Sequence, residues 1–160
     1  MDKLIVFLLL FRKELCTHIR FQFVPLFLLK RLRDSGHLVL RSYFIEERDE
    51  IILKLVNNYF TAVSQVFPEE WNDTSRFILA KTTGYGALLK IFPYYYKKGI
   101  QAKKLSAEFF SHEFMKVKRG LLEQGISLTS KDIASGEQGQ SQLAKLMKNI
   151  SESNSNNNLV

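Results

Sequence analysis

Residues 46–67, EERDEIILKLVNNYFTAVSQVF, decide the fold class of this chain. Apolar side chains recur in this stretch every three to four residues, as one face of an α-helix requires. They are Ile51, Ile52, Leu55, Val56, Tyr59, Phe60, Val63, Val66 and Phe67. Pro68 follows, and a proline terminates a helix because it lacks the N–H donor. We therefore predict an amphipathic helix here.

Four carboxylates stand at the start of this predicted helix: Glu46, Glu47, Asp49 and Glu50. Such a cluster has two interpretations, a metal site or a set of charges stabilised by the positive end of the helix dipole. The dipole interpretation needs no metal, and we predict neither a metal site nor a cofactor.

Further helices follow the same pattern. One begins with Thr82 or Thr83 as its cap and ends at Pro93, and another runs from about Ser106 to a stop at Gly125. A flexible turn over residues 135–141 precedes a final helix, and residues 38–44 suggest a short strand. The sequence thus predicts a mainly α domain of about four to six helices, with at most one or two short strands.

The N-terminal segment differs from the rest. Its run LIVFLLLF begins at Leu4 and ends at Phe11, far below the roughly 20 apolar residues of a membrane span. A helix that is apolar all round must be buried, so we predict a docking surface for a protein partner or for self-association. The predicted organisation is an apolar and basic segment over residues 1–37, a helical module over 38–150 and a disordered tail over 151–160.

Charge and cysteine content indicate a candidate partner and a cellular compartment. The 160 residues carry a net charge of +7, and residues 1–45 hold eight Lys and Arg against three Asp and Glu. A basic surface attracts polyanions, so DNA is the natural candidate partner. Cys16 is the single cysteine, which excludes an intramolecular disulfide and favours the cytoplasm.

Three short motifs suggest a family: NNYF at residues 57–60, FPEEW at 67–71 and KTTGYGAL at 81–88. Together they resemble the C-terminal part of DGQHR-domain proteins, which include members associated with DNA phosphorothioation, and the similarity spans roughly residues 38–149. The naming motif Asp-Gly-Gln-His-Arg and the ParB-like region that carries it are absent from this sequence. The resemblance implies a link to bacterial DNA modification or phage defence and contact with DNA.

Two groups of residues are candidates for phosphate contacts. Lys81, Thr82, Thr83 and Gly84 stand at a predicted helix start, where free N–H groups favour anions; the other interpretation makes Thr82 a cap and the glycines packing contacts. Lys97, Lys98, Lys103 and Lys104 follow three tyrosines, as in surfaces that bind single strands by base stacking; the other interpretation is ordinary packing of the tyrosines beside a solvated loop.

Catalytic signatures are missing from the sequence, which contains neither a Walker A loop nor a G-x-S-x-G elbow. His18, His37 and His112 are scattered and lack the paired ligands of a zinc site. We assign no catalytic residue. The leading hypothesis is a DNA-associated accessory module that contacts the phosphate backbone, and the alternative is a protein-interaction module without a nucleic-acid role.

Overall fold

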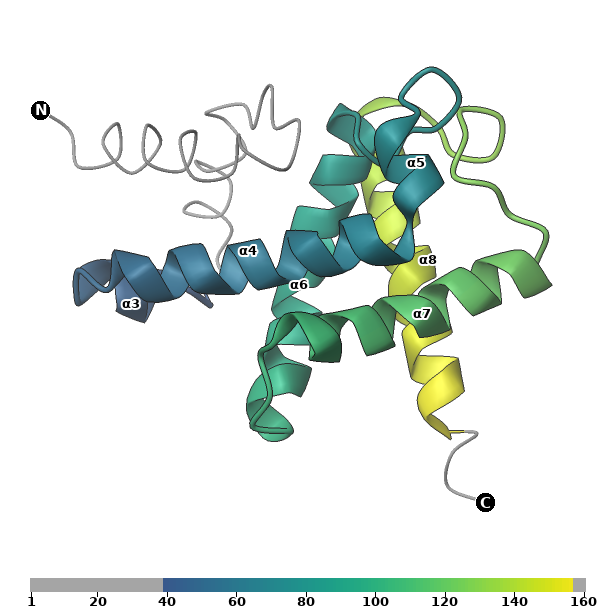
Figure 1. The fold of residues 1–160 in the computed structure, drawn as a ribbon. Coiled ribbons are helices and arrows are strands. Elements are labelled where there is room, and N and C mark those ends of the chain that lie inside the picture. Colours follow the sequence, from purple (N-terminus) through teal and green to yellow (C-terminus); the bar gives the residue numbers. More distant parts are fainter. Residues whose placement is uncertain (1–38, 157–160) are drawn as a thin grey trace, which may run out of the picture. The chain divides into compact units, whose positions relative to one another are not determined.

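The computed structural model describes residues 39–156, which are mainly α-helical as predicted (Figure 1). The helices are α3 (Arg41–Ile45), α4 (Asp49–Val66), α5 (Pro68–Asn72), α6 (Thr82–Gln101), α7 (Ala107–Glu123) and α8 (Gly136–Asn156). The only extended pairing in this described range is an isolated antiparallel bridge between Phe77 and Thr129.

The chain divides into two compact units, residues 1–57 and 58–160, with the division inside α4. In the first unit the strand predicted over residues 38–44 is wrong, because Arg41–Ile45 form α3. Glu47 follows that helix with a left-handed φ of 56°, and the Arg48 N–H donates to the Tyr43 carbonyl at 2.8 Å. The alternation of apolar and polar residues over 38–44 is weak because the stretch is short. The backbone hydrogen bonds of this turn therefore stabilise a helix there instead of a strand.

The core of the second unit is built around Tyr59, which is fully buried. Its ring meets Phe92 and Phe110 edge to face, with centroids 5.0 and 5.3 Å apart. Its hydroxyl donates to the Leu88 carbonyl at 2.9 Å, so the polar end of the side chain is satisfied inside the core. This single residue of α4 therefore joins α6 and α7.

Helix α6 does not end at Pro93, contrary to prediction; it continues for two further turns to Gln101. Proline removes one helical hydrogen bond, but the part of α6 beyond Pro93 carries Tyr95, whose side chain is completely buried. Burial of a large aromatic side chain contributes roughly 1.5–3 kcal/mol, which offsets much of that loss. Tertiary packing thus overrides the local stop signal.

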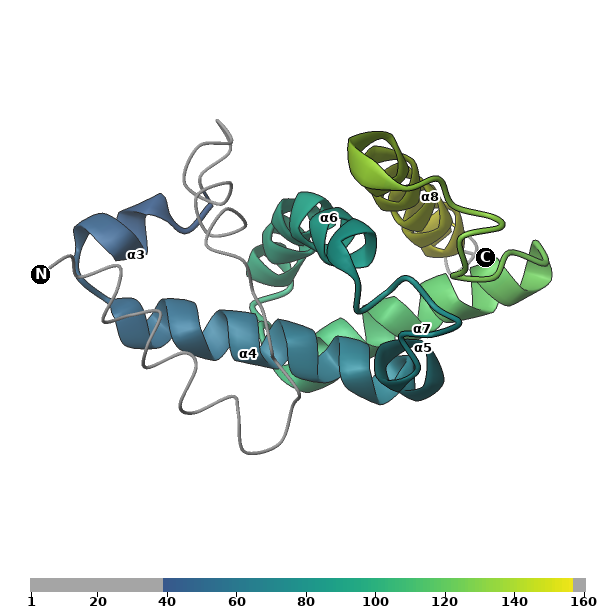
Figure 2. The ribbon, with the colours of Figure 1, turned by 90° about the horizontal axis from the view of Figure 1, so that it is seen from above.

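Both predicted boundaries of α7 are confirmed. The Ser106 hydroxyl accepts a hydrogen bond from the Phe109 N–H, and Gly125 follows the helix with a left-handed φ of 65°. Figures 1 and 2 show that α7 crosses α8, while α6 runs beside α8. These three helices hold most of the predicted site.

Helix α8 is longer at both ends than the sequence suggested. It begins at Gly136, inside the predicted flexible turn, and it continues to Asn156, so the predicted tail is helical over residues 151–156. Ser151 is fully buried, so the first residue of this polar stretch packs against the core. Residues 157–160 lie outside the described residues, as do the run from Leu4 to Phe11, Cys16, His18 and His37.

Candidate functional site

The two predicted groups of phosphate-binding residues stand at opposite ends of α6. Lys81 is the N-cap, whereas Lys98 lies in the last turn. Seventeen residues separate them, which is about 25 Å at a rise of roughly 1.5 Å per residue. They therefore cannot form one site around one phosphate, although a long polyanion could touch both.

The N-terminal group serves mainly to bring helices together. A Cβ on Gly84 would lie 2.5 Å from the Ile78 carbonyl oxygen, and one on Gly86 would lie 2.6 Å from Nε2 of the Gln140 side chain. No real Cβ approaches so closely, so these two glycines are packing contacts, as one of our interpretations held. The predicted threonine cap is wrong: Lys81 occupies the cap position, and no side chain caps the helix.

The C-terminal group lies on a well-defined turn, residues 97–104, which we call the lysine turn. Lys103 adopts a left-handed φ of 53°. The Lys104 N–H donates to the Gly99 carbonyl at 2.9 Å and the Lys103 N–H to the Ile100 carbonyl at 3.1 Å. This is the Schellman pattern that closes a helix, although its left-handed position usually holds glycine. The backbone hydrogen bonds therefore fix the main-chain positions from which these lysines project.

A long-range contact holds the end of the lysine turn. The Asn58 side chain on α4 donates to the Leu105 carbonyl at 2.9 Å. The Leu105 side chain covers Gly99, where a Cβ would lie 2.5 Å from its Cδ2. The turn is thus attached to the core on both sides.

Lys98, unlike the other three predicted lysines of this group, forms an ion pair inside the unit. Its Nζ lies 2.6 Å from Glu113 Oε2, and Lys116 Nζ lies 2.8 Å from the other oxygen. Burial of Glu113 opposes its ionisation, but the hydrogen bonds from Lys116 and Lys98 outweigh that effect and lower its pKa. The carboxylate therefore stays charged and keeps both lysines engaged.

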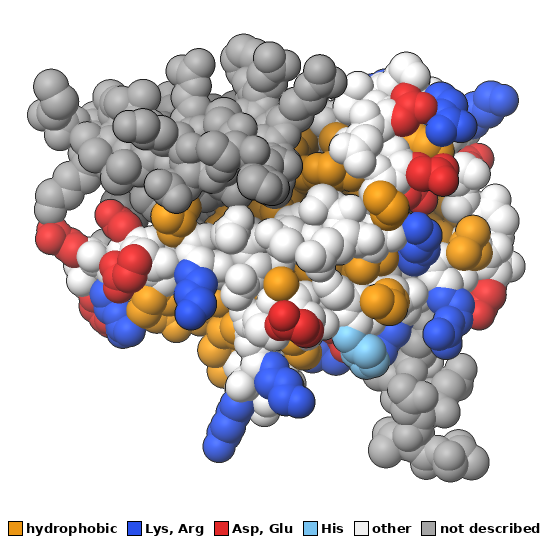
Figure 3. Space-filling model, in the orientation of Figure 1, with side chains coloured by type: hydrophobic (Ala, Val, Ile, Leu, Met, Phe, Trp, Pro, Cys, Tyr) orange, Lys and Arg blue, Asp and Glu red, His pale blue; other side chains and the backbone are white. Residues whose placement is uncertain are grey.

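Lys97, Lys103 and Lys104 are exposed, and within residues 39–156 none of them has an acidic partner. Figure 3 shows Lys and Arg side chains projecting at the lower edge, where Figure 1 places the connection between α6 and α7. These three ammonium groups lie within eight residues of the sequence, so the lysine turn concentrates positive charge on the surface of the described residues.

The tyrosines before the lysine turn do not all fit a stacking surface. Tyr95 is fully buried, and burial raises the pKa of its phenol. The Ser151 hydroxyl donates to the Met147 carbonyl, so the Tyr95 hydroxyl is the donor in its 2.8 Å bond to Ser151. Tyr94 and Tyr96 are half-buried, and Lys148 lies 5.8 Å from the Tyr94 ring centre. Base stacking on Tyr95 is therefore ruled out.

Three buried polar residues organise the unit without having been predicted: Glu113, Gln140 and Ser151. Glu113 had a readable signal, because it interrupts the apolar face that Phe110, Phe114 and Val117 define. Ser151 had none, since it begins a run of polar residues. A polar residue on an apolar helix face indicates that it has a hydrogen-bond or ion-pair partner when buried. The periodicity of the sequence does not show which residue that partner is.

Within the described part of the chain, no group of three or more His, Cys, Asp or Glu side chains could hold a metal ion. His112 is exposed, with Nδ1 3.6 Å from Glu113 Oε1. None of the helices between residues 39 and 156 combines the length and apolar character that crossing a bilayer demands.

Comparison with known proteins adds no relative. No protein-family model, curated protein or solved structure matches this chain.

Proposed function

We propose that this protein is an accessory module that contacts the phosphate backbone of DNA through the lysine turn, without reading base sequence. The observation that carries the proposal is the group of exposed lysines Lys97, Lys103 and Lys104, which have no acidic partner in residues 39–156. Lysine neutralises phosphates as a point charge and releases their counterions, which favours binding to any sequence.

The backbone at Lys103 supports this proposal further. A left-handed φ is unfavourable for lysine and easy for glycine, so the fold itself gains nothing from a lysine at this position. Residues that break a local rule without structural compensation concentrate at functional sites. The resemblance of residues 38–149 to DGQHR-domain proteins points in the same direction, toward a DNA-modification or defence system.

The mechanism we propose is electrostatic. The Schellman turn and the Asn58 side chain hold the backbone of the lysine turn in place, so little backbone order is lost when a phosphate backbone approaches. Glu113 keeps Lys98 inside the unit and limits the site to the three exposed lysines. No bond is made or broken in this function.

Fluorescence anisotropy of the full chain with duplex and single-stranded DNA tests the proposal over a salt series. The variant Lys97→Ala/Lys103→Ala/Lys104→Ala should bind more weakly, and its slope of log K against log salt should fall by about 0.9 per lost phosphate contact on duplex DNA.

The matched control removes the same charge elsewhere: Lys54→Ala/Lys131→Ala/Lys145→Ala changes three lysines that are exposed and lie outside both predicted groups of phosphate contacts. This control should keep most of the affinity. Equal losses in the two variants would show that net charge alone attracts DNA, and no binding at low salt would remove the nucleic-acid function.

A further inference from the structure

The lysine turn carries one large apolar side chain, Ile100, which is 49% exposed. The residue before it, Gly99, is buried, and a Cβ there would meet the side chains of Leu105 and Phe109. Successive residues of a helix point about 100° apart, so Ile100 faces away from the core that Gly99 faces. The side chain of Ile100 therefore contributes little to the packing of this unit.

Ile100 lies between exposed lysines on both sides. Lys97 lies one turn earlier on α6, and residues three apart are neighbours on a helix surface. The Lys103 N–H donates to the Ile100 carbonyl at 3.1 Å, so these two main-chain positions are adjacent as well. A partner that reaches the lysines on both sides therefore also meets the isoleucine between them.

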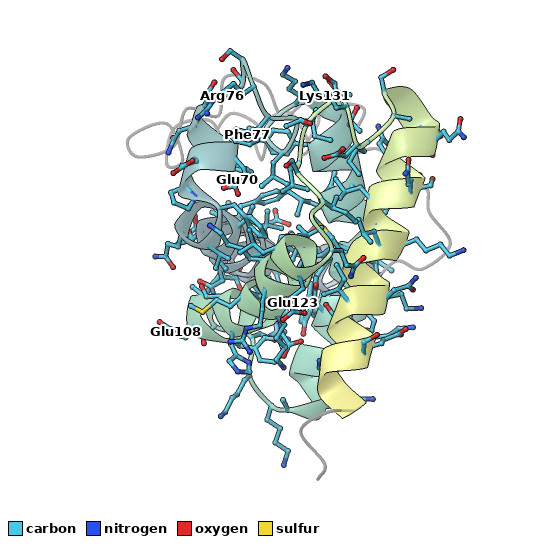
Figure 4. All side chains as sticks on the ribbon, turned by 90° about the vertical axis from the view of Figure 1, so that its right-hand side faces the viewer. Glu70, Arg76, Phe77, Glu108, Glu123 and Lys131 are labelled. Carbon is cyan, nitrogen blue, oxygen red and sulfur yellow. The ribbon has the colours of Figure 1, made fainter. Side chains whose placement is uncertain are left out.

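The stretch of chain around Ile100 contains no carboxylate. No Asp or Glu occurs in the sequence between Asp73 and Glu108. Figure 4 labels Glu108 at the start of α7 and shows side chains that end in nitrogen projecting beyond it at the lower edge of the view. Phosphates are therefore attracted to the surroundings of Ile100, although the side chain itself is apolar.

The position of Ile100 is fixed before any partner binds. Its carbonyl accepts hydrogen bonds from the N–H groups of both Ala102 and Lys103. Its side chain is β-branched, which leaves few rotamers. An apolar group that is already held in this way loses little entropy when it is inserted into a partner.

We infer that Ile100 is a wedge that enters between two stacked base pairs of the DNA bound by the lysine turn. This inference rests on the proposed contact of that turn with the phosphate backbone. Proteins of the minor groove combine cationic side chains with such apolar wedges, isoleucine among them, which unstack one base step and bend the duplex. The contact selects DNA that unstacks easily, and it needs no hydrogen bond to a base.

An anionic membrane also offers negative charge in front of an apolar interior. Membrane affinity grows with the apolar area that is inserted, and the lysine turn provides one large apolar side chain for this purpose. A base step, in contrast, accepts a single side chain. The size of the apolar group therefore favours DNA.

The test compares two duplexes of equal length, one fully paired and one with a single central mismatch, by fluorescence anisotropy with the full chain. The two duplexes carry the same number of phosphates, so contacts to the backbone alone do not distinguish them. Unstacking is easier at a mismatch. The protein should therefore bind the mismatched duplex on the order of tenfold more tightly, the factor expected when the apolar surface exposed on Ile100 is buried.

Three variants assign this preference to the wedge. Ile100→Ala should bind the two duplexes equally, whereas Ile100→Met keeps a long apolar side chain and should keep most of the preference. Leu122→Ala is the matched control, because Leu122 is 73% exposed but lies on α7, outside the lysine turn; it should bind as the unchanged protein does. Ile100 and Leu122 are both exposed, so all three variants should stay folded, which thermal unfolding checks.

A second measurement reports the unstacking itself. The base analogue 2-aminopurine, placed beside the mismatch, fluoresces more strongly when it is unstacked. Its fluorescence should rise when the unchanged protein binds at saturation and should not rise with Ile100→Ala.

The outcomes separate this inference from the proposed function. Equal binding of both duplexes by the unchanged protein, together with weaker binding by the triple lysine variant, would leave the backbone contact intact and overturn the wedge. A mismatch preference that persists in Ile100→Ala would assign it to the flexibility of the DNA and would also overturn the wedge. So would binding to vesicles of phosphatidylcholine and phosphatidylserine that Ile100→Ala abolishes, without any mismatch preference. No DNA binding at low salt would remove both proposals.

Discussion

Replacing Lys103 with glycine should stabilise the protein while weakening its binding to DNA. Lys103 has a φ of 53°, a conformation that costs an L-residue about 1–2 kcal/mol. Glycine removes that cost but loses about 0.5–1 kcal/mol more entropy on folding. The net gain is roughly 0.5–1 kcal/mol, or about 2–6 °C in melting temperature for a unit of this size.

Lys104→Gly is the matched comparison, because it removes the same charge one residue later, where φ is not in the left-handed region. It should lower stability by about 0.5–1 kcal/mol through the entropy of glycine alone. Thermal unfolding measures both effects, and DNA anisotropy should show a similar loss of affinity for both variants. A destabilised Lys103→Gly would refute the strain argument, and unchanged DNA affinity in both would refute the contact.

Three further predictions concern packing and pH. Gly86→Ala should cost about 1–3 kcal/mol by overpacking against Gln140, and adding Gln140→Ala should recover part of that loss in chemical unfolding. Ser151→Ala should cost about 1–3 kcal/mol because it leaves the buried Tyr95 hydroxyl unpaired, whereas Ser151→Ala/Tyr95→Phe should cost less; equal losses would contradict the pairing. Glu113 has a folded pKa below its ordinary value of 4.5, so its contribution to the free energy of unfolding is complete above that pH and is lost as pH falls through the folded pKa. Glu113→Gln should therefore be less stable than the unchanged protein at neutral pH, and the difference in stability should shrink in acid.

The sequence predicted helices well where their periodicity was long and their ends carried a chemical signal. The apolar stripe around Tyr59 and the cap at Ser106 are both of this kind, since each depends only on residues a few positions away. The prediction that α6 ends at Pro93 was wrong because it considered only the local effect of proline on the helix. The burial of Tyr95 depends on α8, which lies more than forty residues further along the chain, and no local window contains that information.

The candidate site shows the same division. Exposed lysines could be predicted as exposed, and Lys97, Lys103 and Lys104 are. The ion pair of Lys98 with Glu113 could not, because it depends on how the last turn of α6 meets α7.

Comparison of three helix ends sets Lys103 apart from Lys97 and Lys98. A residue in the left-handed conformation stands two positions after the end of each of the helices α3, α6 and α7: Glu47, Lys103 and Gly125. The backbone of this motif therefore accepts very different side chains, and α7 uses the residue that costs least. The helix dipole explains Lys97 and Lys98, which lie within the last turns of α6, as charges that stabilise a helix end. Lys103 lies beyond the helix in a conformation that disfavours it, so neither the dipole nor the turn accounts for its charge, whereas the DNA contact that we propose does.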